Sequence, residues 1–156
     1  MTDQRRITML KDKLTIYAEK EDAECINALV FECTEKSDIN MVDIVAVSDS
    51  FKEEAEFPDS LRCAVLPEGL SVSLPTGVRK LTYSVNSTKG DIAALNVQKR
   101  SRCTCFEVLY GVFMSRVFIP DESPYTPSQI IMCISILCGW GASVEKLIPL
   151  INELLK

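Results

Sequence analysis

The feature that most constrains this chain is a series of short β-forming stretches separated by turns. Two of the turns, Pro67-Glu68-Gly69 and Pro75-Thr76-Gly77, combine a proline, whose φ is fixed near about −65°, with a glycine that tolerates positive φ. The stretches between such turns are rich in β-branched and aromatic residues. The pattern predicts strands over residues 12–16, 25–33, 41–47, 61–66, 70–74, 80–86, 92–97 and 104–119, with a short helix as the alternative for the first and a bulge or bend at Gly111 in the last.

Two helices are predicted after these strands. Thr126 and Gln129 fit a capping box, and Pro127 stands at the first helical position, where its missing N–H costs nothing. The helix over residues 127–138 is apolar nearly all round and is expected to be buried. We therefore expect an α+β fold, in which an antiparallel sheet or small β-sandwich is covered by two C-terminal α-helices.

Length and composition predict one folded domain. The chain has 156 residues, of which 47% are hydrophobic and 25% are charged, close to the average for globular proteins. This length matches one domain and is sufficient to bury a core without disulfides or metals. We expect a single globular domain spanning residues 1–156.

The sequence lacks the residues on which common catalytic sites depend. It contains no histidine, and its six glycines form neither of the two common phosphate-binding loops. We expect no enzymatic activity, no catalytic residues and no cofactor. The alternative, an enzyme built on lysine and aspartate, would require a deep pocket with converging polar side chains.

The seven cysteines are scattered among apolar neighbours, which is typical of reduced core residues rather than of a secreted disulfide framework. Cys103 and Cys105 form the tightest pair, but structural zinc sites use two pairs with wider spacing. We expect no bound metal. Trp140, between two glycines, is expected to pack in the core, with stacking on a ligand as the alternative.

The charge of the chain narrows the choice of partners. The net charge is −5, and residues 1–60 hold 15 acidic and 7 basic side chains, a balance of −8. Such a surface repels phosphate backbones and anionic lipids. No apolar run reaches the roughly 20 residues that a membrane-spanning helix needs. We therefore expect neither nucleic-acid binding nor membrane insertion.

The helix predicted over residues 144–155 carries one apolar stripe with 3- and 4-residue spacing. Such stripes usually face the core of the same chain. The alternative is presentation to a groove on a partner protein, and Pro149 inside the helix weakens it enough to favour release. The candidate partner-binding residues are Leu147, Leu150, Ile151, Leu154 and Leu155.

The first third of the chain resembles the small nonstructural proteins of pneumoviruses. The residues that carry the resemblance are Met9-Leu10-Lys11 with Lys13-Leu14, the acidic Glu19, Glu21 and Asp22, the segment from Leu29 to Lys36, the segment Ile44–Ser50, and Ile151–Leu155. The resemblance implies a viral accessory protein that antagonises the type I interferon response through protein–protein interactions. It also implies host signalling proteins and ubiquitin-ligase components as partners, in the host cytoplasm and in the nucleus.

The second functional expectation is a small viral matrix or assembly scaffold that forms homo-oligomers. Residues 109–123 are similar to a stretch of rhabdovirus matrix proteins, although the acidic charge of the chain differs from the basic membrane-facing patches of such proteins. Sedimentation distinguishes a ladder of large oligomers from a monomer or a small defined oligomer.

Overall fold

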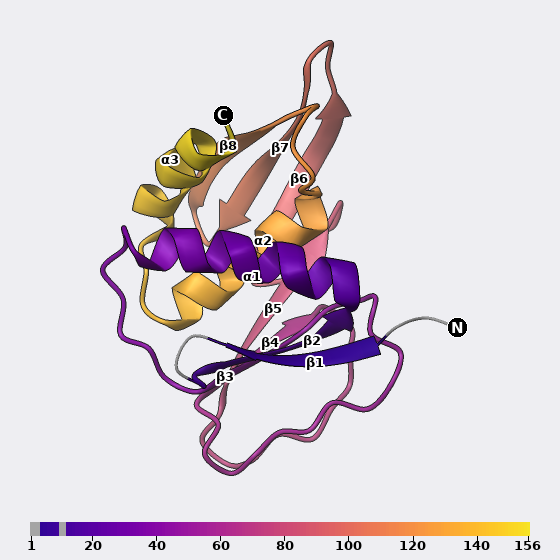
Figure 1. The fold of residues 1–156 in the computed structure, drawn as a ribbon, viewed down its shortest axis with the longest axis vertical. Helices are drawn as coiled ribbons and strands as arrows, with labels where there is room; N and C mark the ends of the chain where they lie inside the picture. The colour runs from indigo at the N-terminus through magenta and orange to yellow at the C-terminus, as the bar shows by residue number, and fades with distance from the viewer. Residues whose placement is uncertain (1–3, 10–11) are drawn as a thin grey trace.

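The computed structural model describes residues 4–9 and 12–156, with side chains from residue 12 onward. Its core is an eight-stranded sheet whose spatial order, β1 to β8, equals the order along the chain (Figure 1). The five strands β2 to β6 run parallel, whereas β1 and the β7–β8 hairpin are antiparallel to their neighbours. The strands are β1 Gln4–Met9, β2 Leu14–Glu19, β3 Ile44–Val47, β4 Cys63–Pro67, β5 Arg79–Val85, β6 Ile92–Lys99, β7 Cys103–Tyr110 and β8 Phe113–Pro120.

The prediction of an antiparallel sheet or small β-sandwich is therefore wrong, because the chain forms an α/β fold. The two predicted C-terminal helices are present as α2 Pro127–Gly139 and α3 Val144–Leu155, and α1 Lys20–Thr34 is a third helix that was not predicted. The strand predicted over residues 25–33 is part of α1. Its buried residues, Ala23, Ile26, Leu29, Val30 and Cys33, recur every three or four positions and form one helical face.

Helix α1 explains why β2 and β3 are parallel. Parallel neighbours need a crossover that returns the chain to the starting edge of the sheet, and a helix is the usual one. Leu14 pairs with Ile44 and Tyr17 pairs with Val47 across this crossover. Helices α1 and α2 pack against each other over one face of the sheet, and α3 lies beside β8 (Figure 1).

Two long loops cover the other face in place of helices. Residues 48–62 join β3 to β4, and residues 68–78 join β4 to β5. Parallel sheets are normally buried on both faces. Here the second face has its own small core, formed by Tyr17, Val45, Val47, Leu61, Ala64 and Leu66, with Phe51, Ala55, Phe57, Val72, Leu74 and Val78 of the loops packed against it.

Several local predictions are confirmed. Strands β3 to β6 lie where short β-forming stretches were expected, and residues 104–119 form β7 and β8, which turn at Gly111 with φ of 63°. The capping box at the start of α2 is present, with Thr126 Oγ1 accepting from Gln129 N–H at 3.2 Å. The strand expected over residues 12–16 overlaps β2, and β1 is a strand that was not predicted. Residues 10 and 11 lie outside the described part.

The strand predicted over residues 70–74 does not form. Residues 70–75 contain no turn, bend or helix, and burial alternates from Ser71 to Leu74, as in a half-buried strand. No ladder, however, joins this segment to the sheet within residues 12–156. It therefore has the side-chain pattern of a strand without a neighbour to pair with.

Asn152 of α3 hydrogen-bonds the free edge of β8. Its side-chain nitrogen donates to the Arg116 carbonyl at 2.9 Å, and its side-chain oxygen accepts from Phe118 N–H at 3.0 Å. An unprotected edge strand presents such groups to other chains. Asn152 occupies the position that the next strand would take.

Replacing Asn152 by leucine is expected to lower the free energy of unfolding by about 1–2 kcal/mol, because the two edge groups lose their partner. It is also expected to produce concentration-dependent oligomers in sedimentation velocity. The Glu153→Leu control adds an apolar side chain at a neighbouring exposed position, leaves both edge hydrogen bonds in place, and should remain as monodisperse as the wild type. An Asn152→Leu chain that sediments like wild type would show that this edge needs no protection.

Candidate functional site

The carboxyl ends of parallel strands are the usual place for ligands in open α/β sheets. In this chain their polar groups bind one another. Ser48 and Ser50, just beyond β3, share a hydroxyl–hydroxyl hydrogen bond of 2.9 Å, and Ser50 Oγ accepts from Glu19 N–H at 3.2 Å. Gln129 of α2 donates to Asp22 of α1 at 2.7 Å. The serine contacts join the start of α1 to the loop after β3, and the Gln129–Asp22 contact joins the starts of α1 and α2.

Tyr83 belongs to the same edge. Its hydroxyl donates to the Val47 carbonyl at 2.7 Å, and the side chain is 2% exposed. Burial raises the pKa of this hydroxyl, and the Asp49 carboxylate adds to the effect. A neutral, hydrogen-bonded tyrosine of this kind holds β5 against β3 rather than acting as a base.

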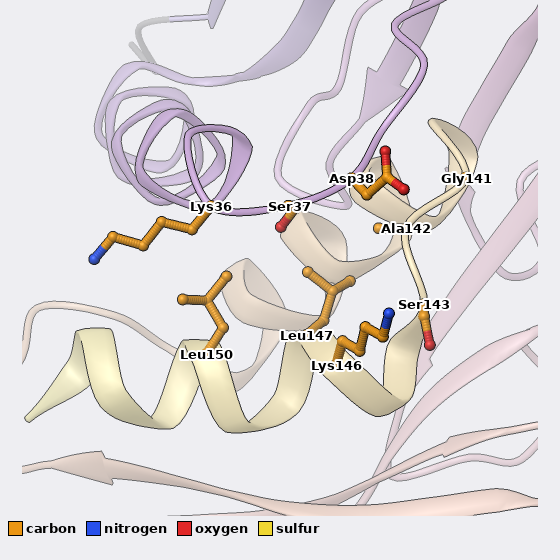
Figure 2. Close-up of a pocket in the computed structure, with 9 residues that line it drawn as sticks. All are labelled: Lys36, Ser37, Asp38, Gly141, Ala142, Ser143, Lys146, Leu147 and Leu150. Carbon is orange, nitrogen blue, oxygen red and sulfur yellow. The ribbon is translucent and has the colours of Figure 1, made fainter.

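A cavity of about 210 Å³ lies where the loop after α1 meets the start of α3 (Figure 2). Leu147 and Leu150 line one side of it, and Lys36, Asp38 and Lys146 supply its charged groups. Figure 2 shows the Lys36 ammonium group extending away from the remaining lining residues. The charged ends do not converge on one point, so the cavity lacks the arrangement of a ligand site.

A larger concavity lies between the two long loops on the second face of the sheet. We name it the loop groove; its volume is about 450 Å³. The two loops run alongside one another below the sheet in Figure 1. The groove is lined by Val47, Phe51, Glu53, Glu54, Ala55, Phe57, Leu70, Ser71, Val72 and Ser73.

The loop groove has an apolar floor and an acidic rim. Phe51, Phe57 and Val72 are half-buried against the second core, whereas Leu70 is 38% exposed, large for an apolar side chain. Glu53 and Glu54 are exposed. Within residues 12–156, neither carboxylate has a cation within ion-pair distance. An apolar concavity with a few charged groups at its rim is the arrangement expected of a binding site.

Sequence reasoning missed the loop groove. The sequence predicts a strand over residues 70–74 and no helix or strand over residues 48–60, and no local pattern places these two segments side by side. One signal in the sequence could have indicated the groove. The apolar residues of the predicted strand, Val72 and Leu74, needed an apolar surface of the sheet to pack against.

The five leucine and isoleucine residues predicted to bind a partner all lie in α3. Leu147, Ile151 and Leu155 are buried, and Leu150 and Leu154 are half-buried against the main core. The helix packs mainly on β8, with further contacts to α1 and α2. Helix α3 is therefore packed on the core of its own chain. Partner binding through these five residues stays a prediction, and it requires α3 to leave the sheet.

The cysteines lie mostly in the core. Burial raises the pKa of Cys63 and raises that of Cys138 to about 12, so both thiols are neutral at physiological pH. Burial also raises the pKa of Cys133, and the neighbouring Cys33 thiol adds to the effect. Among the described residues, no group of three or more cysteine, aspartate or glutamate side chains is placed to hold a metal ion. Nor is any described helix long and apolar enough to span a membrane.

Comparison with known proteins yields structural likeness only. No family model and no curated protein matches the sequence. A UDP-N-acetylmuramoyl-L-alanyl-D-glutamate–2,6-diaminopimelate ligase matches over 70% of this chain with a TM-score of 0.51 and 15% identity. MurF from Acinetobacter baumannii matches over the same share with a TM-score of 0.49 and 11% identity. The chain spans 28% of the length of each protein. The likeness to the first ligase shows that the two share an α/β fold over this region.

Proposed function

We propose that this chain acts by binding a segment of another protein in the loop groove and carries out no chemistry there. The observation that carries the proposal is the groove itself, which offers an apolar floor, an exposed leucine and an acidic rim on a face that none of the described helices covers. Among the described residues, no hydrogen bond joins the serines of its lining to Glu53 or Glu54, and such a contact is what lets a base activate a serine. The polar groups at the carboxyl edge, where catalysis would be expected, are used to hold the fold together.

Selection from a random-peptide phage library tests this proposal. The selected peptides should lose binding to the Leu70→Arg variant, in which a charged side chain enters the groove. They should retain binding to Val112→Arg, which places the same charge at an exposed turn between β7 and β8. Peptides that bind both variants equally would refute the groove as the binding site.

The resemblance to pneumovirus nonstructural proteins supplies the finer proposal that the partner is a host signalling protein of the interferon response. Coexpression with an interferon-promoter reporter tests it. Wild type should suppress the reporter, Leu70→Arg should fail to do so, and Val112→Arg should behave as wild type. Unchanged reporter output with wild type would remove the interferon role while leaving peptide binding intact.

The scaffold alternative requires self-association through sheet edges. Asn152 occupies the edge of β8, which disfavours pairing on that side. A ladder of large oligomers formed by wild type in sedimentation would favour the scaffold instead.

A second candidate function, a domain of a ligase-type enzyme, is favoured by the fold shared with the 2,6-diaminopimelate ligase. A shared fold does not establish a shared activity. Calorimetric titration with UDP-N-acetylmuramoyl-L-alanyl-D-glutamate separates the two candidates. Saturable binding would support the ligase domain, and its absence is expected for a protein-binding module.

A further inference from the structure

We infer that the loop groove takes a basic, extended segment of the partner protein, which adds to this chain as a β-strand between the two loops. This inference rests on the proposed function and names the chemistry of the partner. Three independent features of the groove walls support it: free backbone groups, alternating side-chain burial and unpaired carboxylates.

One wall of the groove is the segment from Leu70 to Leu74. Among the described residues, the backbone N–H and C=O groups of residues 71–74 have no hydrogen-bond partner in the protein. The flanking turns are closed by Leu70 N–H to the Pro67 carbonyl at 3.2 Å and by Val78 N–H to the Pro75 carbonyl at 3.4 Å. The segment is thus held at both ends while its middle remains open, which is the condition for an added strand.

The side chains of this wall alternate in the manner of a sheet. Val72 and Leu74 pack on the second core, whereas Ser71 and Ser73 are exposed. A strand laid beside this wall would likewise point alternate side chains toward the floor. Apolar residues at those positions would contact Phe51, Phe57 and Val72.

The opposite wall also has free backbone groups. Those of Glu54, Ala55 and Phe57 make no hydrogen bond within the described part of the chain. Residues 54–58 run without turn or bend. A segment inserted between the walls can therefore pair its backbone with either one, and the affinity arises from main-chain hydrogen bonds together with alternate apolar contacts.

The negative charge at the rim of the loop groove determines which partner sequences it favours. Glu53 and Glu54 stand at the rim, and Lys52 donates to the Asp49 carbonyl at 2.8 Å. Outward side chains of an inserted strand would lie near the two carboxylates, so lysine or arginine is favoured and glutamate is repelled. Because both carboxylates are exposed, the contribution should weaken as salt rises.

The test uses fluorescein-labelled peptides of about seven residues, the length of an ordinary strand. The probe alternates lysine and valine. One comparison peptide replaces lysine by glutamate, and another keeps the charges but carries N-methyl groups on alternate backbone nitrogens. Affinity is measured by anisotropy against wild type, Glu53→Lys/Glu54→Lys, and Glu122→Lys/Glu145→Lys, which makes the same change in net charge at exposed positions elsewhere.

The lysine–valine probe should bind wild type and the Glu122→Lys/Glu145→Lys control alike. Binding to the Glu53→Lys/Glu54→Lys variant should be about tenfold weaker, the equivalent of about 1.4 kcal/mol. The N-methylated peptide should lose at least as much, and the probe should slow amide hydrogen exchange in residues 71–74.

No binding of the probe, equal loss in both charge variants, or full binding of the N-methylated peptide would each overturn the inference. Library peptides that depend on the groove but prove to be acidic would do so as well. In that last case the proposed function would stand, whereas a library without any groove-dependent peptide would remove the function itself.

Discussion

Replacing Trp140 by alanine is expected to lower the free energy of unfolding by about 3–5 kcal/mol. Trp140 caps the end of α2 and is 1% exposed. Its indole nitrogen donates to the Val42 carbonyl at 2.8 Å, and its own carbonyl accepts from Asn40 N–H at 2.8 Å. The side chain therefore connects α2 to the segment that leads into β3. Its removal creates a cavity and leaves a carbonyl without its donor.

Urea unfolding followed by far-ultraviolet circular dichroism measures this effect, since the variant loses the only tryptophan of the chain. Trp140→Phe should cost less than alanine, because it keeps most of the packing and loses the hydrogen bond. The Phe31→Ala control removes an aromatic side chain that is 49% exposed and should change stability by no more than about 0.5 kcal/mol. A Trp140→Ala variant as stable as this control would contradict the core role.

The Gly90→Ala substitution is expected to destabilise the chain by about 3 kcal/mol. A Cβ at Gly90 would lie 2.7 Å from both the Ser84 nitrogen and the Tyr83 carbonyl carbon. These are backbone atoms of β5, so relief requires a shift of the strand. Gly90 N–H also donates to Ser84 Oγ at 3.1 Å, which holds the short connection between β5 and β6 against the sheet.

Gly139→Ala is the matched control for this second prediction. The nearest atoms to its Cβ would be Ile44 Cδ1 at 2.9 Å and Cys63 Sγ at 3.2 Å, both at side-chain ends that can rotate. We expect a cost of about 1 kcal/mol there. Urea unfolding of both variants compares them directly. An equal loss of unfolding free energy in the two variants would show that the backbone of the β5–β6 connection shifts as easily as a core side chain.

The parts of the fold that sequence reasoning predicts well are those whose signal is local. The start of α2 depends on Thr126, Pro127 and Gln129 alone, and the structure has the expected cap. Helix α1 was misread because residues 25–33 include Ile26, Val30 and Phe31, which favour strands. A window over residues 20–34 would have shown the three- and four-residue spacing of buried positions.

The direction of the strands could not be predicted from local pattern. Pro67-Glu68-Gly69 and Pro75-Thr76-Gly77 are genuine turn sequences, and both turns form. They lie within one long loop between two parallel strands rather than at the tip of a hairpin. Whether a turn reverses a strand or only bends a connecting loop depends on where the next strand finds its partner, which is a property of the whole sheet.

The candidate site, too, could be predicted from local sequence only in part. The apolar stripe of α3 could be predicted because helical spacing is encoded in neighbouring residues, and the structure packs these residues into the main core. The loop groove joins Phe51 and Phe57 to Leu70 and Val72, across an intervening strand. Its acidic rim could be read from Glu53 and Glu54, but its floor exists only after the second face of the sheet has formed.

The identity of strand order and chain order has a consequence during synthesis. As the polypeptide leaves the ribosome, each parallel strand can join the one before it without waiting for distant sequence. The sheet face formed by β4 to β6 is covered later, because α2, which packs on it, is translated only after β8. A nascent chain that has completed the sheet therefore still displays a broad apolar surface. Burial of this surface requires synthesis of the chain as far as Gly139, where α2 ends, or a chaperone.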